Sequence, residues 1–254
     1  MPKISDPIQI SKLTLKNRYV KAPTVCGHAS EEGFVSDRLL DLYQAEARGG
    51  VGMVICHAAF IRQDGQGFRS QTGIYDDKCI NGLNRLAETI QAAGARAAIQ
   101  IFHAGAIAQP KIIGGRTPVS PSSIPLFLDP TQKTRALEDE EIEELARLYG
   151  VACARAKEAG FDAVEIHACH GSLIQQFLSP SFNSRTDRWG EDRLLFARRV
   201  IQEIRKAIGP DFPLLWRISA EEFIGAKGFT LKDTIESFLP AYLQEGISCV
   251  DVSA

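Results

Sequence analysis

The chain has 254 residues, of which 44% are hydrophobic and 24% charged, and its formal net charge is −2. This composition is typical of a globular protein with one large core. It offers no broad basic surface, so nucleic acid is excluded as an expected partner. The most apolar stretch, residues 51–60, is far shorter than the roughly 20 residues needed to cross a bilayer, and residues 1–10 lack the features of a secretion signal. We therefore expect a cytoplasmic protein without a membrane segment.

The cysteines lie scattered along the sequence, at Cys26, Cys56, Cys79, Cys153, Cys169 and Cys249. None forms a CxxC pair, so the sequence indicates neither a disulfide framework nor a local zinc or iron–sulfur motif. Free thiols in a reducing compartment are the expectation.

The expected elements repeat one pattern, in which a helix ends near a glycine and an apolar, β-branched strand follows. A short hairpin over residues 4–17 comes first and is expected to cover the N-terminal end of the strands. Strands are then predicted at residues 19–22, 51–58, 97–102, 163–167, 214–218 and 247–252. The helices between them are predicted at residues 37–48, 77–93, 139–158, 191–208 and 231–244. This alternation indicates a single α/β domain over residues 1–254 with a parallel sheet.

Two α/β architectures fit the alternation of strands and helices. A doubly wound sheet that binds a dinucleotide would carry GxGxxG directly after a strand. A partial match, Gly65-Gln66-Gly67, lies in an expected loop and lacks the third glycine. A TIM barrel of the (β/α)8 type, with about six of its eight βα units present, is therefore the predicted fold.

The most informative segment spans residues 161–190. An apolar strand there ends on His167, His170 follows three residues later, and the run FLSPSFNSRTDRWG comes after them. Side chains at the carboxyl ends of parallel strands converge on a crevice, where α/β folds place their chemistry. The alternative is structural, with His167 at a strand end, His170 in a solvated turn and Cys169 as a small buried hydrophobe.

The order and spacing of HxxHG, LI, FLSP, Asn, RTD and an aromatic-Gly pair resemble the old yellow enzyme family of FMN-dependent NADH:flavin oxidoreductases. The resemblance extends over essentially all 254 residues. It implies a TIM barrel with FMN at its C-terminal mouth, NAD(P)H as the reductant, and a small electron-poor acceptor such as an α,β-unsaturated carbonyl. It indicates neither an oligomeric state nor a preference between NADH and NADPH.

A complete barrel of this type needs two more βα units than the sequence carries, and in TIM barrels the loops after strands seven and eight commonly hold a phosphate. In the resembled family these loops hold the FMN phosphate. We therefore expect the sequence to be a fragment of a longer gene product, with an open sheet that exposes two edges. The alternative is a non-catalytic remnant that does not retain FMN.

Candidate flavin contacts follow the first two strands. The resemblance assigns Ala22, Pro23 and Thr24 to the isoalloxazine ring, and Ala58 to a position where the ring approaches the backbone. One branch of the family has a redox-tuning cysteine two residues after the proline, whereas Cys26 stands three residues after Pro23. Cys26 is therefore either a flavin contact or a buried structural thiol.

Two polar side chains interrupt apolar strands. Gln100 needs a partner if it is buried, either a neighbouring backbone group or the pyrimidine edge of a flavin, and the resemblance implies the flavin. Arg217 cannot lose its charge, so it needs an anionic or electron-rich partner. The resemblance places Arg217 beside the flavin N1–C2=O edge, and a salt bridge with Glu165 or Glu221 is the alternative.

The resemblance makes His167 and His170 the catalytic pair, which donates hydrogen bonds to the acceptor carbonyl and polarises it. A metal site is a minor alternative, because the pair has no further ligands nearby in the sequence, and none is assigned. Ser172 stands where most family members carry the tyrosine that protonates the acceptor, and a serine is a poor general acid. A TIM-barrel lyase is a further alternative. It would need a buried Schiff-base lysine or metal-binding carboxylates at the strand ends, of which the sequence gives no sign.

Overall fold

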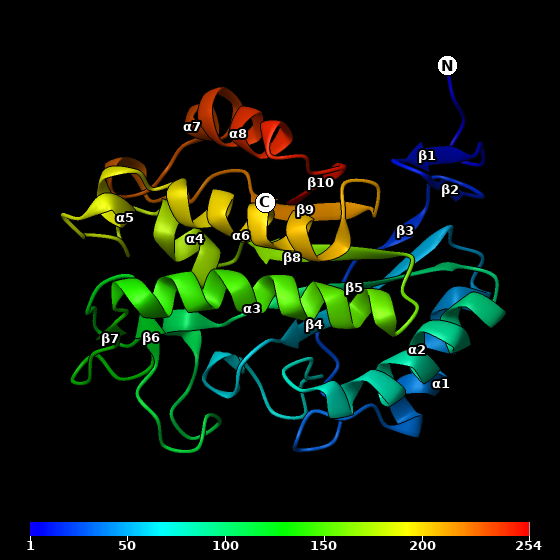
Figure 1. Ribbon diagram of the computed structural model, residues 1–254, viewed down its shortest axis with the longest axis horizontal. Helices are drawn as coiled ribbons and strands as arrows, with labels where there is room; N and C mark the ends of the chain where they lie inside the picture. The colour runs from blue at the N-terminus through cyan, green and yellow to red at the C-terminus, as the bar shows by residue number, and fades with distance from the viewer. Residues whose placement is uncertain (254) are drawn as a thin grey trace.

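The computed structural model describes residues 1–253, and its main feature is a curled sheet of six parallel strands (Figure 1). These strands are β3 (Val20–Lys21), β4 (Met53–Phe60), β5 (Arg96–Phe102), β8 (Ala163–Ala168), β9 (Leu214–Ser219) and β10 (Cys249–Ser253). Each pairs in parallel with the next one along the chain, so β3 and β10 form the edges. A doubly wound sheet would reverse its strand order at one point, and this sheet does not. The order is that of a barrel with six of its eight strands present, as predicted.

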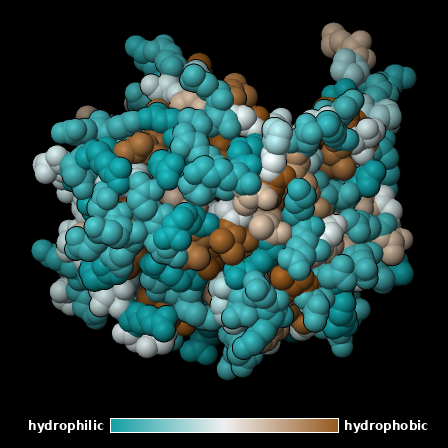
Figure 2. All heavy atoms as spheres, in the orientation of Figure 1, coloured by the Kyte–Doolittle hydropathy of each residue, from teal (hydrophilic) through white to brown (hydrophobic). Residues whose placement is uncertain are grey.

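Helices cover the outer face of this sheet. They are α1 (Asp37–Arg48), α2 (Ile80–Ala92), α3 (Asp139–Glu158), α6 (Leu195–Ile208) and the short C-terminal pieces α7 (Leu231–Asp233) and α8 (Leu239–Gln244), which the π-helix η5 (Thr234–Phe238) connects. The main core lies between their apolar faces and the strands, and α3 and α6 pack directly against each other on this face. Figure 2 shows this side of the molecule covered mainly by hydrophilic side chains, with apolar side chains in narrower patches. Amphipathic helices on a buried sheet produce this distribution.

Most predicted boundaries are confirmed within a few residues. Both α1 and α3 have the predicted limits, and Gly94 and Gly160 follow α2 and α3 with φ angles of 89° and 85°. The prediction was wrong at residues 191–194, because a separate short helix, α5 (Arg188–Glu191), precedes α6. The side chain of Asp187 starts α5 by accepting a hydrogen bond from the Trp189 N–H, which satisfies a free donor at the helix start.

The N-terminal residues form the predicted hairpin, whose strands β1 (Ile8–Ile10) and β2 (Leu13–Leu15) pair antiparallel. Its apolar side chains lie in a second cluster of buried residues, here called the lower core, made of Ile10, Leu13, Leu15, Met53, Ile55, Ala98, Ala163 and Leu215. Since four strands of the sheet contribute to the lower core, the hairpin closes the inside of the sheet at its N-terminal end.

Short elements surround the opposite, C-terminal end of the strands (Figure 1). They include α4 (Leu173–Leu178), the two-residue strands β6 (Val119–Ser120) and β7 (Arg135–Ala136), and the 3-10 turns η1 (Gln63–Gly65), η2 (Asp77–Cys79), η3 (Gly105–Ile107) and η4 (Gly225–Lys227). All six residues of α4 are buried. Among the described residues, no helix combines the length and apolar character that a membrane span requires.

Candidate active site

A layer of polar side chains lines the inside of the sheet directly above the lower core. Gln100 and Glu165 are register partners on β5 and β8, and Arg217 and Asp251 are register partners on β9 and β10. Gln100 lies two residues after the lower-core residue Ala98, so the period of two places both on the inner face. The Gln100 amide donates from Nε2 to Glu165 Oε1 over 2.8 Å. The sheet thus unites Gln100 and Arg217 with two carboxyl groups that the sequence did not assign to the site.

The electrostatics of this layer are unusual because it is buried. Loss of water raises the pKa of Glu165 to about 8, with a further contribution from the neighbouring charge of Asp251. Its Oε2 atom has no hydrogen-bond partner within residues 1–253. Arg217 Nε lies 3.3 Å from Asp251 Oδ2 without hydrogen-bond geometry. The carboxylate nearest to Arg217 is therefore Asp251, and not Glu165 or Glu221 as the alternative from sequence proposed.

His167 is the last inner residue of β8 and the register partner of Arg217. Its Nδ1 lies 3.0 Å from the hydroxyl of Ser172, and this hydroxyl also donates to the carbonyl oxygen of His167 over 3.0 Å. Burial, together with the charges of His170 and Arg217, lowers the pKa of His167 to about 3. The ring is therefore neutral at physiological pH, and Ser172 controls its orientation.

His170 lies in the turn after β8, with a left-handed φ angle of 51°. Its backbone N–H donates to Ser219 Oγ over 3.1 Å, and its Nε2 lies 2.7 Å from Ser253 Oγ on the edge strand β10. The centroids of the two imidazole rings are 5.3 Å apart. The predicted pairing of His167 and His170 at one strand end is thus present in the geometry.

Cys169 lies between the two histidines. Its Sγ is 3.6 Å from His167 Nε2 and 3.4 Å from His170 Nδ1. The side chain is buried, and this burial raises the pKa of the thiol. Sequence reasoning treated Cys169 only as a small apolar residue, because its position between two imidazoles depends on the left-handed turn at His170.

The segment after β3 brings Pro23 beside the polar layer. Arg217 Nη1 lies 3.5 Å from the carbonyl oxygen of Pro23. Ala22 and Thr24 are exposed, and both accept hydrogen bonds from Lys21 Nζ, at 2.7 Å and 3.2 Å. Lys21 Nζ also forms an ion pair with Glu46 Oε1, 3.3 Å away, at this exposed edge of the sheet.

Cys26 is directed away from the polar layer. Its Sγ lies 3.3 Å from Nδ1 of His57, a buried residue of β4 that also contacts the Tyr43 hydroxyl at 2.9 Å. Burial raises the pKa of Cys26.

Ala58, which follows His57 on β4, is 5% exposed. It lies at an irregularity of the strand, where the register with β5 shifts between Cys56 and Ala59. Such bulges near strand ends redirect the side chains around a site.

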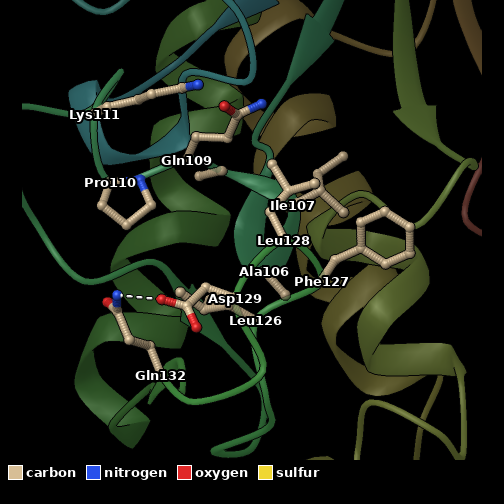
Figure 3. A pocket seen from close by; sticks show the side chains of 11 residues that line it. Ala106, Ile107, Gln109, Pro110, Lys111, Leu126, Phe127, Leu128, Asp129 and Gln132 are labelled. Atoms are coloured by element: carbon tan, nitrogen blue, oxygen red, sulfur yellow. Dashed lines mark hydrogen bonds between the residues drawn. The ribbon is translucent and has the colours of Figure 1, made fainter.

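A pocket of about 480 Å³ opens beside the histidine turn, between the residues after β5 and the loop that joins β6 to β7 (Figure 3). Ile107 lines the pocket and also lies beside the histidine turn. Its Cγ2 atom would be 3.8 Å from a Cβ atom placed on Gly171, the residue after His170. Phe127 and Leu128 line the pocket while remaining 88% and 67% exposed. Sequence reasoning missed this pocket, although the apolar run Leu126-Phe127-Leu128 in an otherwise polar loop was a visible signal.

Comparisons with known proteins agree with this geometry. The model of the NADH:flavin oxidoreductase / NADH oxidase family matches residues 3–246. An NADH oxidase of Thermoanaerobacter brockii is 39% identical over 258 residues, which cover 100% of this chain and 39% of that protein. A 2-naphthoyl-CoA reductase, solved as a complex with 2-naphthoyl-CoA, superposes with a TM-score of 0.92 at 30% identity, over 98% of this chain and 40% of that one.

An old yellow enzyme homologue from Zymomonas mobilis superposes with a TM-score of 0.88 at 28% identity, over 99% of this chain and 73% of that one. The chain therefore spans only about two fifths of the length of the NADH oxidase and of the naphthoyl-CoA reductase, and about three quarters of the length of the old yellow enzyme homologue. On the strength of the match over residues 3–246 and the shared barrel, the chain belongs to the NADH:flavin oxidoreductase / NADH oxidase family.

Proposed function

We propose that the protein containing this chain is an FMN-dependent NAD(P)H oxidoreductase of the old yellow enzyme type. We further propose that its acceptor is electron-poor, with an α,β-unsaturated carbonyl as the preferred class. Bound FMN supplies the relay of a hydride from NAD(P)H to this acceptor. The six cysteines are free thiols, which supports the proposed cytoplasmic location.

The observation that carries the proposal is the partly buried guanidinium of Arg217, whose side chain is 15% exposed. Its Nε is a buried donor that lies 3.3 Å from Asp251 Oδ2 but makes no hydrogen bond in the described part of the chain, and a buried donor without a hydrogen bond is costly. A flavin ring above β9 would offer this donor an electron-rich edge, so the residues present fit the cofactor. Pro23, Thr24 and the small side chain of Ala58 surround the same space in this proposal. Gln100 would contact the ring through its carbonyl oxygen or its second amide N–H, because only one of its two N–H groups donates to Glu165.

The histidines would hold the acceptor. The single hydroxyl proton of Ser172 is donated to the carbonyl oxygen of His167. The contact between Ser172 Oγ and His167 Nδ1 therefore needs a proton on Nδ1, which donates to Oγ. In this tautomer Nε2 carries no proton and is an acceptor. The other tautomer carries its proton on Nε2, after Nδ1 has lost a proton to water and Nε2 has gained one from water. In that tautomer Ser172 would donate to Nδ1, and Nε2–H would donate to an acceptor carbonyl. In this proposal His167 and His170 polarise the carbonyl by hydrogen bonding.

Ser172 does not supply the proton that the usual tyrosine provides. Its side chain is fully buried, and its hydroxyl is held by two atoms of His167. We propose that water reaching the open mouth of the site protonates the acceptor. The apolar pocket beside Gly171 would take an apolar substituent of this acceptor, with Phe127 as its outer wall.

The test is the replacement Arg217→Ala. We expect FMN affinity to fall by roughly tenfold to a hundredfold, because a charge-assisted hydrogen bond contributes about 1.5 to 3 kcal/mol. The reduction potential of bound FMN should also fall, since a positive charge that stabilises the reduced flavin is removed. Both are measured by fluorescence titration with FMN and by spectroelectrochemistry.

The matched control is Arg147→Ala, at an exposed arginine on α3. It should leave both quantities unchanged. Equal FMN affinity and potential in the Arg217→Ala and Arg147→Ala proteins would refute the assignment of Arg217. Failure of the unmodified protein to bind FMN at all would favour the non-catalytic remnant.

A further inference from the structure

Three side chains in four consecutive residues converge on one point at the end of β8. One ligand atom from each of His167, Cys169 and His170 lies within 4.8 Å of the others. The two sulfur–nitrogen separations are 3.6 Å and 3.4 Å. A tetrahedral zinc ion, with a Zn–S bond of about 2.3 Å and Zn–N bonds of about 2.0 Å, separates its sulfur and nitrogen ligands by roughly 3.5 Å. Both sulfur–nitrogen separations therefore match those of a zinc site, and the two nitrogens lie within 4.8 Å of each other.

The second nitrogen of each ring contacts a serine hydroxyl, although His167 Nδ1 also lies 3.8 Å from Cys169 Sγ. Ser172 Oγ lies 3.0 Å from His167 Nδ1, and Ser253 Oγ lies 2.7 Å from His170 Nε2. In metal sites, a histidine ligand commonly donates its second ring N–H to such an oxygen, which fixes the tautomer and the ring orientation. With the ring protons on His167 Nδ1 and His170 Nε2, the same arrangement would leave His167 Nε2 and His170 Nδ1 with lone pairs for an ion.

The backbone holds this geometry in place. A φ angle of 51° at His170 is a conformation that residues with a Cβ atom seldom adopt, and it turns the His170 ring back toward β8. The hydrogen bond from the His170 N–H to Ser219 Oγ ties the turn to β9. The three ligands thus converge without requiring another segment of the chain to move.

We propose that His167, Cys169 and His170 bind one thiophilic divalent ion of the zinc class. As the metal–sulfur bond forms, the thiol proton leaves to solvent, and no electron is transferred. Three protein ligands leave the fourth tetrahedral position to water. The ion would occupy His167 Nε2, the nitrogen that the proposed function assigns to the acceptor carbonyl. If that function holds, metal binding and acceptor binding exclude each other.

The experiment is a titration of the purified, flavin-free chain with Zn²⁺ by calorimetry, and with Co²⁺ by absorption spectroscopy. Cys169→Ala is compared with Cys249→Ala, a partly buried thiol whose Sγ lies against the carbonyl of Val250. The unmodified chain and Cys249→Ala should bind one ion per chain and show the near-ultraviolet band of a cobalt–thiolate bond. Cys169→Ala should lose the band and bind Zn²⁺ at least about tenfold more weakly.

Equal Zn²⁺ affinity in Cys169→Ala and Cys249→Ala, or no cobalt–thiolate band in the unmodified chain, overturns the proposal. His170→Ala is a second variant, at an exposed ring, and should weaken Zn²⁺ binding while the far-ultraviolet circular dichroism stays unchanged. Because no flavin is present, the outcome is independent of whether the protein is an FMN oxidoreductase.

Discussion

Glu165 is the carboxyl group of the polar layer whose pKa is raised by burial. It is fully buried, and its pKa is raised to about 8 from a normal value of 4.5. A carboxyl group with this pKa is mostly protonated at neutral pH, so it is able to donate a hydrogen bond toward Asp251. The sequence shows Glu165 only as a charged residue inside an apolar strand.

The raised pKa of Glu165 predicts a pH dependence of stability. The folded protein holds this proton up to about pH 8, whereas the unfolded chain releases it near pH 4.5. The contribution of Glu165 to the free energy of unfolding is therefore fully present below pH 4.5. It decreases by about 1.4 kcal/mol per pH unit as pH rises from 4.5 toward 8. Glu165→Gln cannot ionise and keeps an amide oxygen for Gln100. We expect it to become progressively more stable than the unmodified protein as pH rises.

The measurement is urea unfolding of both proteins across this pH range. Comparing the two cancels the opposite pH dependence of the buried histidines, which both proteins share. Glu88→Gln, on the exposed side of α2, is the control and should show a constant difference from the unmodified protein. A constant difference for Glu165→Gln as well would contradict the raised pKa.

Among the elements, long amphipathic helices were predictable and short buried ones were not. A capping hydrogen bond at Ser36 marks the start of α1, and a reciprocal capping box of Glu138 and Glu141 marks the start of α3. By contrast, the residues of α4 are all buried, so the segment lacks the polar face that reveals a helix in a sequence.

The N-terminal hairpin gives a prediction at the same scale. Leu15 is fully buried in the lower core, whereas its neighbour Thr14 faces solvent. Leu15→Ala should lower the free energy of unfolding by about 2 to 5 kcal/mol, because it removes buried methyl groups and leaves a cavity. Thr14→Ala should change it by less than about 0.5 kcal/mol. Similar values for both variants in urea unfolding would show that the hairpin does not close the sheet.

At the scale of the whole molecule, the sheet has two open edges. Tyr19 and Val20 at β3 and Val252 in β10 are exposed, at 53%, 41% and 60%. An exposed apolar edge strand is a template for pairing with another chain. We therefore expect the 254-residue chain to associate with itself in solution.

The replacement Val252→Lys tests this association. A lysine on an edge strand opposes pairing between strands, so the average mass in analytical ultracentrifugation should shift toward the monomer. Val151→Lys on α3 alters a side chain of 41% exposure away from both edges and should leave the mass distribution unchanged. A monodisperse monomer of the unmodified chain would refute the expectation.

The sequence by itself determined the alternation of strands and helices and the position of the two histidines at a strand end, because both follow from periods of two and 3.6 residues within single segments. The tertiary structure alone decided which polar groups meet. Asp251 lies beside Arg217, and Glu165 lies beside Gln100, because the register between strands is set by the packing of residues far apart in the chain. Cys169 lies between His167 and His170 for a related reason, since the left-handed turn at His170 is held by Ser219 and Ser253 from two other strands.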